Sequence, residues 1–216
     1  MLLLEARKEL IKYGRKLVTA GLTSGTGGNL SIYDRESGYV AVTPSGMDYF
    51  EIEPEDIVIT GIDGNKIEGT RKATSELSFH LALYKHRADI NAVVHTHSSF
   101  ATIVACLGQE LPAVHYMVAF SGNKVPLAPY ATFGTQELAD NMINAIGDYN
   151  AVLLANHGLV TISGNLPNAF AASEEIEFTA RIYIQARSAG EPVILSDDEM
   201  ETVVEKFKWY GNKVEP

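Results

Sequence analysis

The sequence is poor in cysteine, long apolar runs and clustered positive charge. Its single cysteine, Cys106, can form no internal disulfide, which fits a reducing cytoplasm, and its apolar surroundings predict a core position. No apolar run approaches the roughly 20 residues of a membrane-spanning helix. Charged residues follow Met1–Leu4 too soon for a signal peptide. These absences predict a cytoplasmic protein that does not enter a membrane.

The charge balance narrows the class of partner. Asp and Glu number 27 against 17 Lys and Arg, which gives a formal net charge of −10. An acidic chain without a basic patch is not suited to nucleic acid or to an anionic membrane surface. A negatively charged small molecule would therefore need local help from backbone N–H groups. At 216 residues and 46% apolar composition, the chain is predicted to form one domain over residues 1–216.

Hydrophobic periodicity and turn signals predict clustered strands early in the chain and helices interleaved with strands later. This order indicates an α+β or α/β fold in which a central, largely antiparallel β-sheet is sandwiched between helices. The predicted helices cover residues 2–20, 76–87, 98–107, 135–146, 167–189 and 196–209. The predicted strands cover 30–34, 39–43, 57–60, 66–68, 92–97, 151–156 and 159–162, with 112–119 extended and 122–129 irregular.

Two histidines spaced two apart follow an apolar strand. His95 and His97 would point to the same side of that strand, because side chains alternate along a strand. The pair fits either half of a metal site or two hydrogen-bonding histidines near a strand end. His157 ends another apolar strand, so three imidazoles can meet, which is the pattern of a catalytic zinc site with one open position. Glu76 could fill that position, and His80 is a weaker rival ligand.

A glycine-rich loop precedes the first predicted strand. Gly25–Asn29 contains three glycines, which permit either a tight turn or a nest of N–H groups for an anion. Both common nucleotide-binding glycine loops precede a helix instead, so neither applies here. Thr74 or Ser75 is a plausible N-cap of the helix that starts near Glu76, and a helix start favours an anion. The segment with Thr74 and Ser75 is therefore a second candidate for binding an anion, in addition to the glycine loop.

Eight short motifs occur along nearly the whole chain in a fixed order. They are Gly25–Asn29, Thr43–Gly46, Thr74–Glu76, His95–His97, Pro112–Met117, Ala128–Gly134, Asn156–Gly158 and Lys206–Gly211. This ordered set resembles the class II aldolase/adducin family, most closely its L-fuculose-1-phosphate aldolases.

The resemblance implies a role for particular residues. It implies one Zn²⁺ per subunit, or another divalent metal, held by His95, His97 and His157, with Glu76 as fourth ligand and later as acid/base. It implies a homotetramer with active sites between subunits. The remaining implied residues are Gly28, Asn29, Ser45, Gly46, Thr74 and Ser75 around a substrate phosphate, Phe133 at the aldehyde pocket, Tyr116 as proton donor and Tyr210 reaching a neighbouring subunit's site.

The implied reaction is zinc-dependent retro-aldol cleavage of L-fuculose 1-phosphate, or a closely similar ketose 1-phosphate. Its products would be dihydroxyacetone phosphate and L-lactaldehyde, formed through a metal-stabilised enediolate. A Schiff-base route is disfavoured because no lysine lies within an apolar strand. The alternatives are an L-ribulose-5-phosphate 4-epimerase, a methylthioribulose-1-phosphate dehydratase and a non-catalytic adducin-like module. The epimerase pattern has an aspartate that this chain lacks between His97 and Asp140, and the three histidines argue against a non-catalytic module.

Overall fold

Eight strands form one sheet at the centre of the molecule. The computed structural model describes residues 1–207. Across the sheet, every pair of neighbouring strands is antiparallel except β6 and β7, which are parallel. The largely antiparallel sheet of the sequence prediction is therefore confirmed. In spatial order the strands are β4 (Lys66–Glu68), β3 (Val58–Gly61), β2 (Tyr39–Val42), β1 (Asn29–Asp34), β5 (Ala92–Thr96), β8 (Gly158–Ser163), β7 (Ala151–Leu154) and β6 (Leu127–Ala128).

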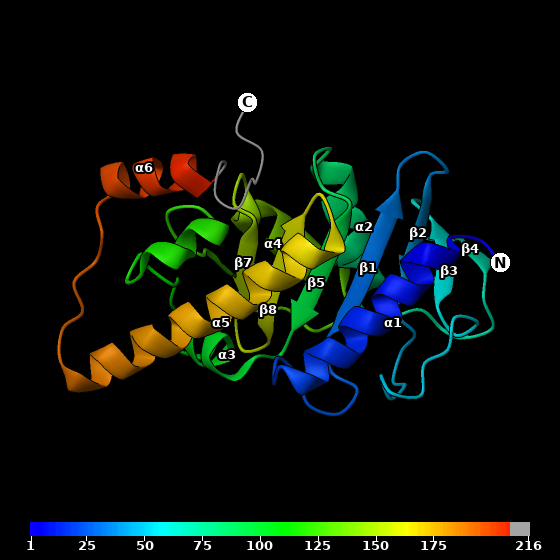
Figure 1. The fold of residues 1–216 in the computed structure, drawn as a ribbon, viewed down its shortest axis with the longest axis horizontal. Helices are drawn as coiled ribbons and strands as arrows, with labels where there is room; N and C mark the ends of the chain where they lie inside the picture. Colours follow the sequence, from blue (N-terminus) through cyan, green and yellow to red (C-terminus); the bar gives the residue numbers. More distant parts are fainter. Residues whose placement is uncertain (208–216) are drawn as a thin grey trace.

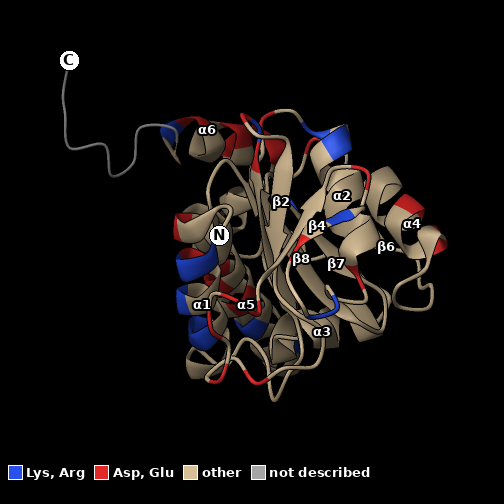
Figure 2. Ribbon diagram, turned by 90° about the vertical axis from the view of Figure 1, so that its right-hand side faces the viewer, with Lys and Arg blue, Asp and Glu red and all other residues tan. Residues whose placement is uncertain are grey.

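Helices cover both faces of this sheet (Figures 1 and 2). One face carries α1 (Leu4–Thr19), α3 (Ser99–Cys106) and the long α5 (Leu166–Ala189). The opposite face carries α2 (Leu77–His86) and α4 (Gln136–Ile146), which pack against each other. The last described helix, α6 (Asp197–Phe207), packs against η1, a 3-10 helix over Tyr116–Phe120. No helix in the part of the chain that the structure describes is long and apolar enough to cross a membrane.

Alternation along β5 divides its side chains between the two faces. Ala92 and Val94 lie in the buried cluster under α1 and α5, whereas Val93 lies with Phe79 in the cluster under α2 and α4. His95, two residues after Val93, lies on the same face of the strand as Val93. Its imidazole therefore faces the α2 side of the sheet, where the site described below is built.

Four local expectations are wrong. Part of the segment expected to be extended, residues 112–119, forms η1, whose start is held by a hydrogen bond from the Met117 N–H to His115 Nδ1. The passage expected to be irregular, residues 122–129, contributes β6. Cys106 is exposed, because it occupies the solvent side of the last turn of α3. Neither Thr74 nor Ser75 is the N-cap of α2; Glu76 takes that position.

Candidate active site

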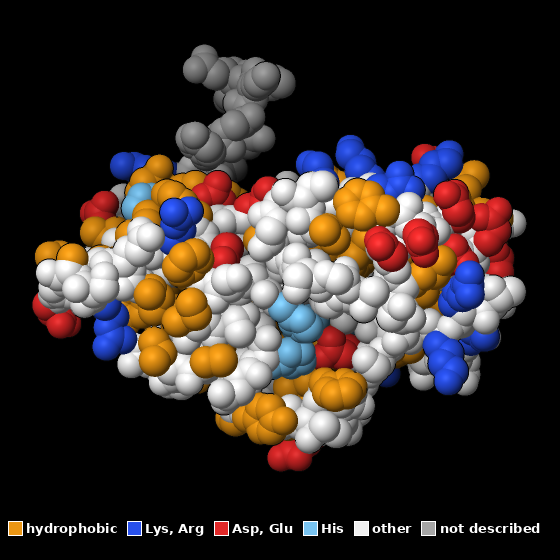
Figure 3. Space-filling view, turned by 90° about the horizontal axis from the view of Figure 1, so that it is seen from below, with side chains coloured by type: hydrophobic (Ala, Val, Ile, Leu, Met, Phe, Trp, Pro, Cys, Tyr) orange, Lys and Arg blue, Asp and Glu red, His pale blue; other side chains and the backbone are white. Residues whose placement is uncertain are grey.

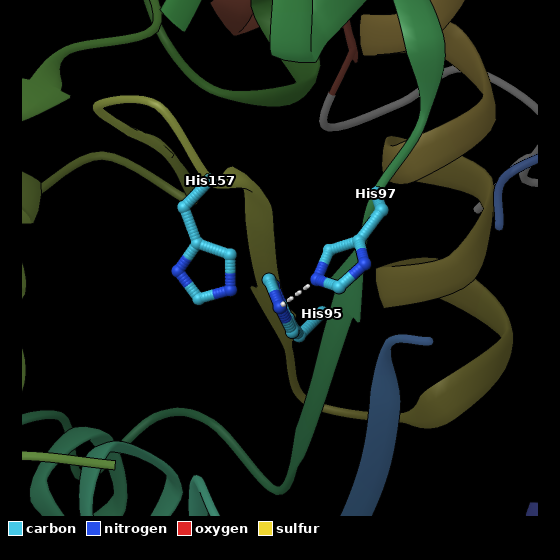
Figure 4. Close-up of side chains that lie close together, drawn as sticks. All are labelled: His95, His97 and His157. Atoms are coloured by element: carbon cyan, nitrogen blue, oxygen red, sulfur yellow. Dashed lines mark hydrogen bonds between the residues drawn. The ribbon is translucent and has the colours of Figure 1, made fainter. Parts of the chain in front are cut away.

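Three imidazoles and one carboxylate converge at one end of the central strands. β5 carries His95, and His97 follows its last residue, whereas the antiparallel β8 begins directly after His157. The end of β5 and the start of β8 therefore lie side by side. β1 begins there with Asn29, which pairs with His95. α2 also begins there, with Glu76 at its N-cap. Figure 4 shows the three rings facing one another.

The distances between these groups fit a metal site. The Nε2 atoms of His95 and His97 are 3.1 Å apart, and Glu76 places its two carboxylate oxygens 3.3 Å from the Nε2 atoms of His95 and His157. Ligand atoms at ordinary zinc distances in a tetrahedral site lie about 3.3 Å from one another. One carboxylate oxygen, Glu76 Oε1, is buried without a hydrogen-bond partner in the described residues, as expected for an atom reserved for another ligand.

The electrostatics of the site favour neutral imidazoles. Burial lowers the pKa of His95 well below its ordinary value, and it lowers the pKa of His97 and His157 as well. His95 Nδ1 lies 3.0 Å from the carbonyl oxygen of Leu159, so that nitrogen carries the proton and Nε2 keeps its lone pair. Burial also raises the pKa of Glu76, partly offset by His157 and by a hydrogen bond from Asn29. The cluster is therefore set up to receive a cation and to exchange a proton.

Two glycines allow the backbone segments of the site to approach closely. A side chain at Gly158 would collide with the carbonyl oxygen of Thr96 and press on the His95 and His97 rings. A Cβ at Gly28 would lie 2.6 Å from the carbonyl oxygen of His95, at a φ of 70° that favours glycine. Both glycines are thus required because neighbouring backbone lies against the histidine strand.

A cavity of about 380 Å³ opens over the histidine cluster. Figure 3 shows histidine and acidic side chains together in a hollow on this face, with hydrophobic side chains beside them. Among the described residues that line it there is no Lys or Arg, so the donors for an anion are hydroxyls, two side-chain amides and backbone N–H groups. The lining contains every residue predicted around the phosphate, together with Phe133: Gly28, Asn29, Ser45, Gly46, Thr74 and Ser75.

Two of these loops are tied to each other. Pro44 and Ala73 form an isolated antiparallel bridge, and the N–H of Thr74 donates to the carbonyl oxygen of Thr43. The N–H of Ser45 donates to the carbonyl oxygen of Lys72 in the same way. Segments 43–46 and 72–75 therefore reach the cavity as one rigid unit, which holds its hydroxyl groups in place before a ligand arrives.

The structure does not bring Tyr116 to this cavity. Tyr116 begins η1, is 49% exposed, and contacts the rings of His115 and Phe207. It is absent from the described residues that line the cavity. Tyr116 therefore lies apart from the cavity of its own chain, and its role as proton donor stays a prediction. Tyr210 lies outside the described residues.

Sequence reasoning did not single out Tyr130 and Asn156, which line the cavity, or Tyr49, which supports it from behind. The Tyr49 hydroxyl donates to the carbonyl oxygen of Gly28 at 2.8 Å and so holds the glycine loop. Tyr130 belongs to the same motif as Phe133, which was a usable signal. Asn156 has a φ of 54°, a conformation that asparagine tolerates better than most residues, and its position beside His157 was a second signal.

Comparison with known proteins agrees with this geometry. Residues 8–184 match the class II aldolase and adducin N-terminal domain. A 5-deoxy-D-ribulose 1-phosphate aldolase of Bacillus thuringiensis serovar kurstaki is 54% identical over 99% of this chain and 100% of its own length. An L-fuculose phosphate aldolase of Escherichia coli K12 is 40% identical over 96% of each chain.

A solved structure titled L-fuculose 1-phosphate aldolase superposes with a TM-score of 0.93 at 53% sequence identity. The match covers 94% of this chain and 96% of that one. Family membership also fits the histidine cluster, because class II aldolases depend on a metal ion and the three imidazoles can hold one. The chain therefore belongs to the class II aldolase and adducin family, and it is one of the aldolases of that family.

Proposed function

We propose that this protein cleaves a short deoxyketose 1-phosphate between C3 and C4, releasing dihydroxyacetone phosphate and a small aldehyde. The observation that carries the proposal is the convergence of His95, His97, His157 and Glu76 beneath a cavity lined by neutral hydrogen-bond donors. Such a cavity suits a phosphorylated sugar, because hydroxyls and backbone N–H groups can donate hydrogen bonds to a phosphate and so bind it without a cationic side chain.

Two substrates are supported. 5-Deoxyribulose 1-phosphate is our first candidate, because the relative at 54% identity carries that name. L-Fuculose 1-phosphate, the substrate predicted from the sequence, is the second, supported by the names of the Escherichia coli relative and of the solved structure. The two molecules share the phosphorylated three-carbon half and differ in the aldehyde released, which is acetaldehyde for the first and lactaldehyde for the second. Discrimination would fall to the side of the cavity near Tyr130 and Phe133, and a hydrophobic pocket discriminates such differences weakly.

The histidines and Glu76 would have different roles in the reaction. A Zn²⁺ ion held by His95, His97 and His157 would act as a Lewis acid, polarising the ketose carbonyl and stabilising the negative charge left on the three-carbon half. Glu76 would deliver a proton to C3 of that half after the C3–C4 bond breaks, and would remove it in the condensation direction. Its raised pKa suits this exchange, since a carboxyl group that is protonated part of the time can both give and take a proton.

In the condensation direction, the oxygen that remains on C4 also needs a proton. We propose that Tyr116 of a second copy of the chain donates this proton, because Tyr116 does not line the cavity of its own chain. This assignment goes with the predicted homotetramer whose active sites lie between subunits. Tyr210 keeps its predicted role beside a neighbouring site.

The experiment is a substrate comparison on purified, zinc-loaded protein. We expect dihydroxyacetone phosphate from 5-deoxyribulose 1-phosphate and from L-fuculose 1-phosphate, assayed separately, and none from L-ribulose 5-phosphate. Epimerised pentose without cleavage, or only a dehydration product from methylthioribulose 1-phosphate, would contradict the proposal.

A variant test addresses the metal site. His95→Ala should abolish both bound metal, measured by elemental analysis, and cleavage. His86→Ala changes an exposed histidine at the end of α2 and serves as the control, which should keep both. Unchanged metal content in His95→Ala would show that the metal assignment is wrong.

A further inference from the structure

A row of polar side chains runs along the buried side of α2 toward the active site. Glu76, His80 and Tyr84 are spaced four apart, so they lie one above another on the same side of the helix. The facing strand β1 carries Asn29 and Ser31, spaced two apart and therefore on one face of the sheet. All five residues are buried, with exposed fractions of 5% or less.

Side chains of the helix and of the strand alternate along one series of hydrogen bonds. Tyr84 OH lies 2.7 Å from Ser31 Oγ, which lies 2.6 Å from His80 Nδ1. His80 Nε2 lies 2.6 Å from Asn29 Oδ1, and Asn29 Nδ2 donates to Glu76 Oε2 at 2.8 Å. The match is geometric, because four helical residues rise about 6 Å and two strand residues about 6.7 Å. The result is one continuous chain of hydrogen bonds that ends on the carboxylate.

Glu76, at the end of this chain of hydrogen bonds, determines which atom donates in each of them. An ionised Glu76 can only accept, so the Asn29 NH₂ group donates to it and the Asn29 oxygen must accept from His80 Nε2–H. His80 is neutral, because burial lowers its pKa to about 3, so its Nδ1 is an acceptor. Ser31 therefore donates to Nδ1, and the Ser31 oxygen accepts from the Tyr84 hydroxyl. Hydrogen bonds aligned in this way polarise and strengthen one another.

Stability alone gives little reason for this row. Phe79 and Leu83 of α2 pack into the apolar core along one side of it and Leu81 along the other, and further apolar side chains could fill the same space. Polar groups in such a place are costly unless each one is satisfied. Here each of the four hydrogen bonds of the row is made, and the row ends at Glu76, the one carboxylate among the described residues that line the cavity, whose other oxygen, Oε1, has no hydrogen-bond partner there.

We propose that His80 is a positioning residue for Glu76. By donating from Nε2 to Asn29 Oδ1, it fixes which way the Asn29 amide faces. The amide NH₂ then holds one oxygen of Glu76 and leaves the other toward His157, 3.3 Å away. Without His80 the amide could turn over and present its oxygen to the carboxylate, which would repel it. This inference rests on the proposed acid/base role of Glu76.

The first test reads the proton on His80 directly. In metal-free protein labelled with 15N-histidine, long-range nitrogen–proton correlation spectra distinguish the two neutral tautomers from the charged ring. The His80 signals are identified as those lost in His80→Gln, and those of exposed His86 serve as the reference. We expect a neutral ring protonated on Nε2 at neutral pH. A ring protonated on Nδ1, or a charged ring, would overturn the proposal.

The second test compares two replacements at the same position. His80→Leu removes the donor to Asn29, whereas His80→Gln retains an NH₂ group at the place of Nε2. We expect His80→Leu to lower kcat about 10- to 100-fold while KM changes by less than about threefold. His80→Gln should restore most of kcat. Wild-type kcat in His80→Leu, or the same loss in His80→Gln as in His80→Leu, would overturn the positioning role.

The two tests separate this inference from the proposed function. The tautomer is read on wild-type protein, with His80→Gln used only to identify the signals, and it requires no turnover, so it remains decisive if His80→Leu fails to fold. Wild-type protein with the expected tautomer but no cleavage of either deoxyketose would contradict the proposed function alone.

Discussion

At the scale of single residues, burial decides how each histidine of the site can be used. His80 and His95 have no exposed surface, whereas the rings of His97 and His157 reach the cavity. Both nitrogens of His80 are occupied by Ser31 and Asn29, so His80 has no lone pair left for a metal. His95 uses one nitrogen on backbone and turns the other toward the cluster. Two equally buried imidazoles thus take different roles according to their second hydrogen-bond partner.

The buried His80 predicts a pH-dependent stability. Its pKa is about 3 in the folded protein against 6.5 for an ordinary histidine. Between these two pH values the unfolded chain binds a proton at His80 and the folded chain does not. The free energy of unfolding should therefore fall as the pH falls below the ordinary value. Between about pH 7 and pH 5 the loss attributable to this one residue is about 2 kcal/mol.

The measurement is urea unfolding of metal-free wild type and His80→Gln at the two pH values. Because the other histidines titrate in both proteins, their contribution cancels in the comparison. Wild type should lose more stability than the variant on acidification. Equal losses would mean that folded protein protonates His80 in this range.

At the scale of elements, the turn between β7 and β8 is the most demanding piece of the site. It aims His157 at the other imidazoles, contains Asn156 at positive φ, and brings Gly158 against the backbone of Thr96. Because β8 also pairs with β5 along its length, the turn cannot move outward without breaking that pairing. The metal site and the sheet are therefore constrained by the same few residues.

This constraint predicts the effect of one added methyl group. Gly158→Ala should weaken metal binding about 10-fold or more, because the new Cβ displaces the Thr96 backbone and the adjacent rings. Gly164→Ala is the matched control, since a Cβ there meets only the carbonyl oxygen of Asp89 at 3.6 Å. Metal titration of both apo-proteins against a coloured chelator gives the comparison. Equal affinities in the two variants would show that the close approach is unimportant.

Much of this arrangement can be read from local patterns. The alternation of Val93, His95 and His97 predicts that both imidazoles share a face, and the apolar run before His157 predicts a second strand end. What a pattern cannot give is the order of strands in the sheet, which places β5 between β1 and β8 and so joins residues about 60 positions apart. The role of His80 was missed for the same reason: its partners lie on β1, and only the four-residue spacing of Glu76, His80 and Tyr84 hinted at them.

Tertiary packing decides two further positions that local sequence does not. Cys106 has apolar neighbours in the sequence, yet α3 buries Ala101, Val104 and Ala105 and turns Cys106 outward. Tyr116 carries a family motif, but its place in η1 is set by packing against α6, far along the chain. Local sequence therefore identifies residue types better than it identifies the surfaces they face.

At the scale of the whole molecule, the position of Tyr116 predicts complementation between inactive variants. If one copy supplies the histidines and another supplies Tyr116, then His95→Ala and Tyr116→Phe should each be inactive or nearly so. Co-refolded as an equal mixture, they should regain about a quarter of wild-type cleavage. In a symmetric ring, half of the sites have intact histidines, and in half of those the neighbouring subunit has an intact Tyr116.

The control for this experiment is a mixture of His95→Ala with His97→Ala. Both variants have a defective histidine cluster, so no site in the mixture has all three histidines. That mixture should stay inactive. Absence of recovery in the first mixture, with mixed oligomers demonstrated by mass spectrometry, would mean that Tyr116 serves its own chain or none.

The two borders of the sheet limit how such copies can associate. β4, at one border, is a three-residue strand carrying Lys66 and Glu68, and β6, at the other, has two residues and lies between Pro126 and Pro129. Short, charged or proline-flanked borders offer too few free N–H and C=O groups to recruit another strand. Lateral fusion of sheets, the route to fibrous aggregates, is thereby discouraged. Growth of an assembly is left to side-chain contacts between helices and loops, which can close into a ring of fixed size.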